Sequence, residues 1–165
     1  MSSLDVLRNK IVPIAELGHL VARLRFKSKK IVFTNGCFDI LHLGHIDYLS
    51  KASDEGDVLM VGLNTDASIR RIKGPQRPIN DEQQRSMLLA ALHVVDHVIL
   101  FDEDTPSELI QHIGPDVLVK GADYTIDRIV GADFVLSKGG AVKTIEFLPG
   151  FSTTGMINRI KMGES

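Results

Sequence analysis

KIVFTNGCFDILHLGH, residues 30 to 45, decides the fold of this chain. Its first half is a short apolar run closed by a glycine, which is the pattern of a buried strand that leads into a loop. The residues that follow, LGHIDYLSKASDEG (43 to 56), have the apolar spacing of a helix. The stretch therefore predicts a strand, a loop and a helix in succession.

The same alternation of apolar and helical segments continues along the chain. Apolar runs typical of buried strands recur at residues 57–64, 96–101, 115–121 and 141–148. Further segments with helical spacing lie at residues 81–95, 105–114 and 152–162. Strands that alternate with helices indicate an α/β fold, here a Rossmann-like five-stranded parallel sheet with helices on both faces.

Ahead of the first strand, residues 14–26 predict an amphipathic helix. Its apolar residues recur at helical spacing: Ile14, Leu17, Leu20, Val21 and Leu24. The chain shows no repeat and no low-complexity linker. We therefore expect one domain over residues 1–165, with a helical extension over 1–29 and the core of the fold over 30–160.

Composition excludes several classes of function. The chain has 165 residues, 44% of them hydrophobic, and a formal net charge of -2, which argues against bulk nucleic-acid binding. Cys37 is the single cysteine, so neither an intrachain disulfide nor a cysteine zinc site is expected. The N-terminus lacks a signal-peptide pattern, and no apolar run approaches the roughly 20 residues that span a bilayer. We expect a soluble cytoplasmic protein without a membrane or nucleic-acid partner.

Two histidines, His42 and His45, stand three residues apart at the start of the helix that follows the first strand. Both should lie on one face, near the free backbone N–H groups of the helix start, which attract phosphate. Gly44 has no side chain, so a nucleotide can approach the backbone closely. The alternative is that the pair only caps or covers the helix. Upstream lie the turn residues whose main chain we expect at the phosphates: Asn35, Gly36, Cys37 and Phe38.

The run GCFDILHLGH resembles, along its whole length, the G-x-F-D-x-x-H-x-G-H motif of the cytidylyltransferase-like family of nucleotidyltransferases. The resemblance extends from about Lys30 to Arg159. It implies the HxGH nucleotidyltransferase fold, and it implies that His42 and His45 are catalytic and stabilise charge on the α-phosphate. A phosphate nucleophile, with a second pKa of about 6, is already ionised near pH 7. Positioned donors and cations therefore suffice for the chemistry.

The cations predicted to serve this chemistry lie in the run SIRRIKGPQRPI, which contains no acidic residue. We expect a loop after the second strand in which Lys73 and Arg77 clamp substrate phosphate. Arg70 and Arg71 are expected to face solvent. The alternative for the whole run is a solvated surface.

Further segments match nucleotide-binding positions of the family. The resemblance implies that Arg85 contacts phosphates, although Arg85 has an alternative role as the i to i+4 partner of Asp81. After the fourth strand, the matching residues are Lys120, Gly121 and Asp123; the alternative role of Asp123 is to cap the next helix. The last segment resembles G-x-S-T-T, where a helix start and hydroxyl groups hold the triphosphate: Gly150, Phe151, Ser152, Thr153 and Thr154.

Acidic and amide side chains also follow the first two strands: Asp39, Asn64 and Asp66. They are expected on the substrate side of the site, either near magnesium or, for Asp39 in particular, orienting loop N–H groups. The resemblance implies that Mg²⁺ is carried mainly by the nucleotide phosphates, so no protein ligands are assigned to the metal.

Departures from the cytidylyltransferases favour another nucleotide and acceptor. Their arginine before the S-T-T segment is absent here, and the lysine that glycerol-phosphate enzymes carry after HxGH is Asp47. The run GCFDILHLGH is here called the signature. Together with it, the segments VGLNTDAS, KGPQRPIN, VLVKGADY and FSTTGMI are similar to bacterial D-glycero-D-manno-heptose 1-phosphate adenylyltransferases. The resemblance implies a stand-alone homo-oligomeric enzyme that converts ATP and this sugar 1-phosphate to ADP-heptose and pyrophosphate, for lipopolysaccharide core or surface glycans.

Three other functions compete with this one. A cytidylyltransferase for glycerol 3-phosphate or another phosphorylated alcohol or sugar would share the chemistry. A nicotinamide-dependent oxidoreductase would carry G-x-G-x-x-G after the first strand, which the residues GCFD do not fit. A non-catalytic nucleotide-binding module predicts ATP affinity without turnover.

Overall fold

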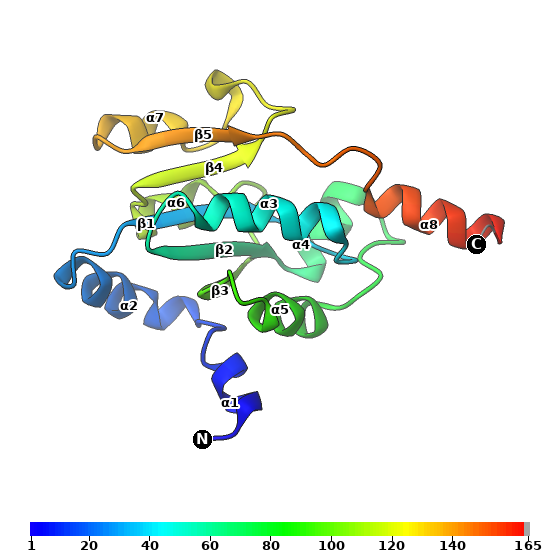
Figure 1. Ribbon diagram of the computed structural model, residues 1–165, viewed down its shortest axis with the longest axis horizontal. Helices are drawn as coiled ribbons and strands as arrows, with labels where there is room; N and C mark the ends of the chain where they lie inside the picture. Colours follow the sequence, from blue (N-terminus) through cyan, green and yellow to red (C-terminus); the bar gives the residue numbers. More distant parts are fainter. Residues whose placement is uncertain (164–165) are drawn as a thin grey trace.

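The computed structural model describes residues 1–163 and shows one parallel β-sheet with helices on both sides (Figure 1). The strands are β1 (Ile31–Gly36), β2 (Val58–Asn64), β3 (His97–Phe101), β4 (Val117–Gly121) and β5 (Ala141–Ile145). Their order in the sheet is β3-β2-β1-β4-β5, and every neighbouring pair is parallel. The predicted five-stranded parallel sheet is confirmed.

The helices connect the strands in the alternating order that the sequence predicts. They are α1 (Ser3–Arg8), α2 (Ile14–Phe26), α3 (Leu43–Ser53), α4 (Asp66–Lys73), α5 (Glu82–Ala91), α6 (Ser107–Ile113), α7 (Ala132–Ser137) and α8 (Thr153–Met162), with a 3-10 turn η1 (Ile126–Arg128) before α7. Of these, α1, α4, α7 and η1 are not predicted as helical from the sequence.

The hydrophobic core lies on both faces of the sheet because side chains alternate along each strand. On one face, Ile31 and Phe33 belong to a cluster built with α2, α6 and α7. On the other face, Val32 belongs to a cluster built with α3 and α5. Helices therefore cover both faces, as predicted.

The basic run after β2 is a helix, α4, and not the loop that the sequence predicts. The hydroxyl of Thr65 caps this helix by accepting the N–H of Ser68, and Asp66 lies in its first turn. The chain leaves the helix at Gly74, whose φ of 92° reverses its direction. The loop therefore begins only at Gly74, because the cap and the acidic residue stabilise a helix up to that point.

The leading helix α2 packs as its spacing predicts, with one exception. Leu17, Leu20 and Leu24 are buried, whereas Ile14, in the first turn, is 52% exposed and lies outside the core. Before it, Ser2 and Asp5 cap α1 reciprocally through side-chain to backbone hydrogen bonds.

One edge of the sheet collects the features that the sequence singles out. The carboxyl ends of β1, β2 and β4 meet at this edge, where ligands of parallel sheets bind. Helix α8 starts next to α3 and extends away from the sheet (Figure 1), and none of its residues is buried. Within residues 1–163, no helix is both long and apolar enough to cross a membrane.

Candidate active site

The signature places its two histidines side by side at the start of α3. His42 is the residue that precedes the helix, and its ring stacks on that of His45 with centroids 3.8 Å apart and planes 19° apart. A Cβ atom on Gly44 would lie 3.1 Å from both the His42 ring and Cβ of Phe151. A larger residue at this position would therefore have to displace the His42 ring or Phe151 by a few tenths of an ångström.

Burial keeps both imidazoles neutral at pH 7. Burial lowers the pKa of His45 to about 4, and the charges of His42 and Lys73 act in the same direction. Burial also lowers the pKa of His42. In the structure, each Nδ1 atom is buried and lacks a hydrogen-bond partner among the described residues. A neutral imidazole has one N–H to donate, and an approaching triphosphate would favour the protonated form.

Lys120, at the end of β4, is a third functional group at this edge. Its Nζ donates to Oδ1 of Asn35, on the neighbouring strand β1, over 2.5 Å. Burial lowers the pKa of Lys120 to about 8, against the nearby charges of Asp123 and Cys37. The ammonium group therefore lies near its titration point at physiological pH.

These groups surround a cavity of about 360 Å³, here called the sheet-edge cavity. It brings together many residues predicted as nucleotide or substrate contacts: Asn35, Gly36, Cys37, Phe38, Asp39, His45, Lys73, Arg77, Lys120, Gly121, Asp123 and Thr153. The aromatic residues Tyr48, Tyr124 and Phe147, which the sequence does not single out, complete its wall. The roles of the predicted residues in ligand binding stay predictions.

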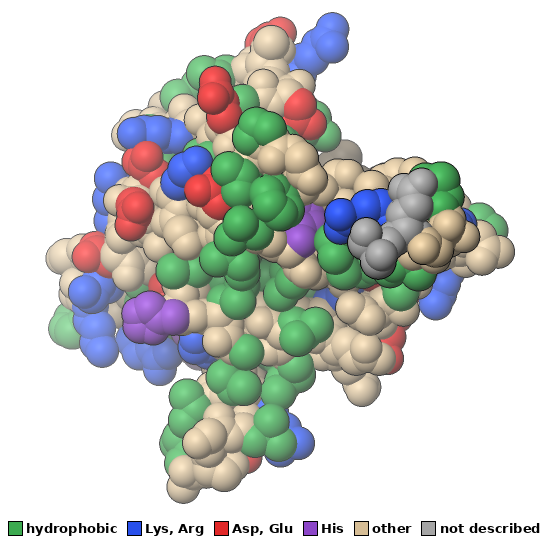
Figure 2. Space-filling view, turned by 45° about the vertical axis from the view of Figure 1, so that its right-hand side comes forward, with side chains coloured by type: hydrophobic (Ala, Val, Ile, Leu, Met, Phe, Trp, Pro, Cys, Tyr) green, Lys and Arg blue, Asp and Glu red, His purple; other side chains and the backbone are tan. Residues whose placement is uncertain are grey.

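A second cavity, of about 660 Å³, lies between the starts of α3 and α8 and is here called the α8 cavity. Histidine atoms are visible on this side of the molecule beside the projecting C-terminal helix (Figure 2). The hydroxyl of Ser152 caps α8 by accepting the N–H of Gly155 over 3.0 Å. The predicted residues on its wall are His42, Gly150, Phe151 and Ser152, while Thr154 is exposed nearby.

Arg159 also lines the α8 cavity, although the sequence does not single it out as a site residue. A signal for it was present. Ser152, Gly155 and Arg159 are spaced by three and four residues, so they share one face of α8. The face that begins with the Ser152 cap therefore carries Arg159 as well.

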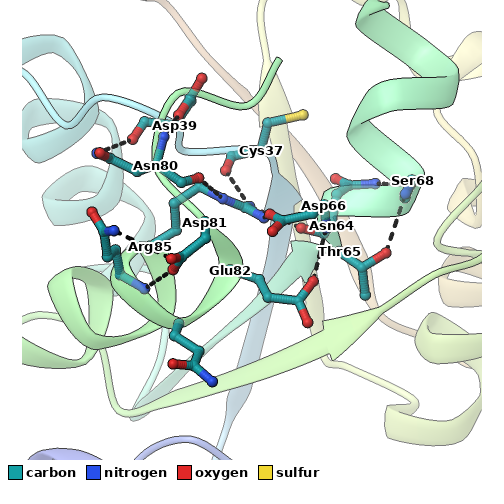
Figure 3. Close-up of polar contacts among 12 residues, drawn as sticks. Cys37, Asp39, Asn64, Thr65, Asp66, Ser68, Asn80, Asp81, Glu82 and Arg85 are labelled. Atoms are coloured by element: carbon teal, nitrogen blue, oxygen red, sulfur yellow. Dashed lines mark hydrogen bonds and ion pairs between the residues drawn. The ribbon is translucent and has the colours of Figure 1, made fainter. Parts of the chain in front are cut away.

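The structure corrects the prediction that Arg85 contacts phosphate. Arg85 is fully buried, and its guanidinium donates only to groups of the protein (Figure 3). Its ion-pair partner is Asp66 at 2.7 Å, and not the predicted alternative Asp81, which instead caps α5. The prediction is wrong because the end of β2 and the start of α4 lie against α5. They supply the carbonyl and carboxylate groups that accept the N–H groups of Arg85.

Asp39, on the wall of the sheet-edge cavity, also has several partners within the protein. It accepts the N–H groups of Ile79 and Asn80, and its ion pair with Nε of Arg77 spans 2.8 Å. Burial alone would raise the pKa of Asp39, but these N–H donors and the Arg77 charge outweigh it and hold the pKa below its usual value. The structure shows the predicted alternative, in which Asp39 orients loop N–H groups, while its role in substrate binding stays a prediction.

Asn64 and Asp66, also predicted as substrate contacts, form hydrogen bonds within the protein and do not line the sheet-edge cavity. Their role in substrate binding stays a prediction. The amide of Asn64 is buried and donates to the hydroxyl of Ser68 over 3.0 Å. The carboxylate of Asp66 accepts from Arg85, and its N–H donates to Glu82 over 2.8 Å. Both residues have partners within the protein because the start of α4 folds against α5.

The cations of the basic run divide by position. Arg77 lines the sheet-edge cavity, but its guanidinium is paired with the carboxylate of Asp39. One of the two cations predicted to clamp substrate phosphate therefore already has an ion-pair partner within the protein. Arg71 pairs with Asp102 and Asp104 and does not simply face solvent as predicted. Lys73 lines the cavity with no ion pair among residues 1–163. Among the described residues of this run, Lys73 is thus the cation that both lines the cavity and has no ion-pair partner.

Comparison with known proteins places this site in a family. A family model described as cytidylyltransferase-like matches residues 33–147, well over half of the chain. The chain belongs to the cytidylyltransferase-like family. This membership confirms the predicted reaction class, a nucleotidyltransferase. Among the part of the chain that the structure describes, no group of three or more His, Cys, Asp or Glu side chains is arranged to hold a metal ion.

Curated relatives of this cytidylyltransferase-like chain include two proteins named Bifunctional protein HldE. The one from Citrifermentans bemidjiense is 53% identical over 152 residues, covering 92% of this chain and 31% of the relative. The one from Campylobacter jejuni subsp. jejuni serotype O:2 is 57% identical over 142 residues, covering 86% and 30%. The chain thus spans less than a third of the length of these relatives.

Solved structures extend the comparison. The lipopolysaccharide core biosynthesis protein from Thermoplasma volcanium GSS1 is 34% identical with a TM-score of 0.58, covering 73% of this chain and 97% of that one. The pantoate-beta-alanine ligase from Francisella tularensis has a TM-score of 0.59 at 19% identity, covering 94% of this chain and 78% of that one. The second similarity concerns the fold alone.

Proposed function

We propose that this nucleotidyltransferase transfers the adenylyl group of ATP to D-glycero-D-manno-heptose 1-phosphate, releasing pyrophosphate and forming ADP-heptose. One observation carries the proposal. The stacked pair His42 and His45 stands where two cavities meet, because His42 lines the α8 cavity and His45 lines the sheet-edge cavity. Two phosphorylated substrates can therefore bring their phosphates to the same pair of imidazoles.

The proposed mechanism is an in-line displacement at the α-phosphorus. An oxygen of the sugar phosphate forms the new P–O bond while the bond to the pyrophosphate oxygen breaks, and the electron pair leaves with pyrophosphate. The N–H groups of His42 and His45 donate to the α-phosphate oxygens as charge develops there. Lys73 and Lys120 attract phosphate from the sheet-edge side, and Arg159 does so from the α8 side.

Magnesium enters the proposal with the nucleotide. The carboxylates of Asp39 and Asp66 are already held by arginines, so they do not form a free ligand set for the metal. Mg²⁺ coordinated by the triphosphate fits these residues, since it usually binds substrate phosphates and few protein groups. It would neutralise phosphate charge when bound.

The choice of nucleotide and acceptor is supported by the relatives, which share 50 to 57% identity with this chain over most of its length. Their name marks a bifunctional protein, of which this chain matches one part. The similarity to a solved structure of a lipopolysaccharide core biosynthesis protein supports a role in surface glycan synthesis. Because ATP is a cytoplasmic nucleotide, the proposed reaction is a cytoplasmic one. The proposal includes a homo-oligomer, which light scattering measures directly.

Pyrophosphate release tests the proposal. The protein is incubated with Mg²⁺, the heptose 1-phosphate and each nucleoside triphosphate in turn, and pyrophosphate is followed. We expect release with ATP and only background with CTP. Release with CTP but not with ATP would overturn the adenylyl assignment. A parallel panel with glycerol 3-phosphate and other sugar 1-phosphates tests the acceptor and separates the cytidylyltransferase alternative.

A further inference from the structure

Arg85 is the largest side chain in the protein that is fully buried. A guanidinium ion removed from water costs several kcal/mol unless hydrogen bonds and an opposite charge compensate it. Arg85 has both: Nε donates to the Asn80 carbonyl over 3.0 Å, and Nη2 to Asp66 over 2.7 Å. Nη1 donates to two further carbonyls, those of Cys37 at 2.9 Å and Asn64 at 2.8 Å. The residue is therefore a cross-link and not a surface cation.

The four acceptors of Arg85 come from segments that are distant in the sequence. Cys37 belongs to the signature loop, Asn64 ends β2, Asp66 starts α4, and Asn80 precedes α5 (Figure 3). A planar guanidinium with five N–H donors can hold such divergent acceptors at once, whereas an ammonium group cannot.

Asp39 forms a second connection between the same segments. Its carboxylate accepts the N–H groups of Ile79 and Asn80, and Nδ2 of Asn80 donates back to the Asp39 carbonyl over 3.0 Å. The loop before α5 is thereby fixed to the signature loop by both Asp39 and Arg85. The contacts are largely removed from solvent, which strengthens them.

The segment between the two attachment points carries Lys73. Arg85 holds this segment near its start at Asp66 and at its end at Asn80, and Lys73 lies between them on the wall of the sheet-edge cavity. The charge of Lys73 acts on His45, which lines the same cavity. The distance between Lys73 and the histidines therefore depends on the contacts of Arg85.

We propose that Arg85 is a positioning residue for the transfer reaction: it holds segment 66–80, with Lys73, in fixed register with signature loop 37–45, without touching substrate. This inference rests on the proposed function, because it requires Lys73 and His45 to act on the same phosphates. Positioning errors of about 1 Å can cost a hundredfold in rate, so the contribution of Lys73 should vanish when the register is lost.

A double-mutant cycle between Lys73 and Arg85 tests the proposal. In the wild type, Lys73→Ala should lower kcat/KM for ATP by about tenfold or more. Arg85→Lys, which keeps the positive charge but loses the planar guanidinium with its divergent N–H donors, should lower kcat/KM by a similar factor. In the Arg85→Lys protein, Lys73→Ala should cost less than about threefold, because coupled residues are non-additive. Full additivity of the two substitutions would overturn the proposal.

Arg25 offers a matched control at the opposite edge of the sheet. It also donates to a carboxylate and a carbonyl, of Asp116 and Gly114, but these partners directly precede β4, at the amino ends of the strands, and Arg25 is partly exposed. Arg25→Lys should change kcat/KM by less than about twofold, as an exposed pair contributes little. In the Arg25→Lys protein, Lys73→Ala should lower kcat/KM for ATP as much as it does in the wild type. Asp66→Asn serves as a second anchor variant if Arg85→Lys unfolds.

Hydrogen exchange separates this inference from the function on which it rests. In unliganded Arg85→Lys, the amides of Ile79 and Asn80 should exchange at least about tenfold faster, because local opening of the loop becomes easier. Arg25→Lys should leave them unchanged. Unchanged exchange in Arg85→Lys would overturn the positioning role even in an active enzyme. Faster exchange in Arg85→Lys, in a protein that lacks adenylyltransferase activity, would support the role of Arg85 in holding segment 66–80 in place. The same result would overturn the proposed function.

Discussion

The polar side chains at the catalytic edge of the sheet form two groups, here called the anchored half and the open half. They differ in whether their polar atoms are paired within the protein or face the cavities. The anchored half consists of side chains whose polar groups bind other groups of the protein: Asp39, Asn64, Asp66, Arg77 and Arg85. The open half consists of side chains that point into the two cavities with donors to spare: His42, His45, Lys120 and Ser152. The difference teaches that one half fixes the geometry of the site before any ligand arrives, while the other half is left free to bind it.

Electrostatics follows the same division. In the anchored half, burial is compensated, and the pKa of Asp39 is held below its usual value. In the open half, the effect of burial outweighs that of the neighbouring groups, and it lowers the pKa of His45 to about 4 and that of Lys120 to about 8. Groups whose charged form lacks a partner in the free protein gain most from a polyanionic ligand.

The largest effect should come from His45 in the open half. His45→Ala should lower kcat by at least about a hundredfold, because it removes a preorganised donor to the developing charge. Steady-state pyrophosphate release measures this. His97→Gln is the control, since His97 is also a partly buried histidine with an unpartnered Nδ1 but lies on β3, outside both cavities. An unchanged kcat in His45→Ala would support a non-catalytic nucleotide-binding module.

Asp39→Asn should damage the anchored half through stability. Arg77 loses its partner and an amide N–H faces backbone N–H donors, at a cost of about 2 to 3 kcal/mol in the free energy of unfolding. Urea unfolding measures it, with Asp47→Asn in the exposed Asp47–Lys51 pair as a control expected to cost below about 0.5 kcal/mol. Equal costs for the two variants would contradict the division into halves.

The pH dependence of stability gives an independent check on Asp39. Its folded pKa lies below the ordinary 3.8, so its contribution is complete above that value and is lost as the pH falls through the folded pKa. Asp39→Asn should therefore lose less stability than the wild type between about pH 5 and 2.

The two halves also differ in how far the sequence predicts them. The order of apolar and helical segments predicts all five strands, and the motif of His42, Gly44 and His45 predicts where the open half lies. By contrast, partner choice in the anchored half depends on contacts between residues about 20 to 50 positions apart, such as Arg85 with Cys37 and Asp66. Sequence position places such residues at strand ends, but it does not reveal whether a carboxylate meets a guanidinium or a ligand.

Lys120 should give the open half a basic limb in its pH profile. Because burial lowers its pKa to about 8, its ammonium form disappears above that pH, and phosphate binding weakens. We expect kcat/KM for ATP to fall about tenfold per pH unit above this point, since kcat/KM reports the free enzyme. Lys120→Arg, which stays charged, should abolish the limb. A wild-type profile that is flat to pH 9.5 would argue against Lys120 as a phosphate ligand.

The smallest effect should come from two helix caps, one in each half. Ser152 caps α8, none of whose residues is buried, whereas Asp81 caps α5, which carries the buried Arg85 and Leu89. Each substitution by alanine removes about 1 kcal/mol of capping, but the loss should appear in a different property of each variant.

Ser152→Ala should lower ATP affinity about fivefold in calorimetry with little change in urea midpoint, because α8 adds no buried surface and its cap lines the α8 cavity. Asp81→Ala should lower the midpoint first, since α5 holds the cross-link of the anchored half. If Ser152→Ala lowered stability and left affinity intact, α8 would belong with the anchored half, and the division of the edge would have to be redrawn.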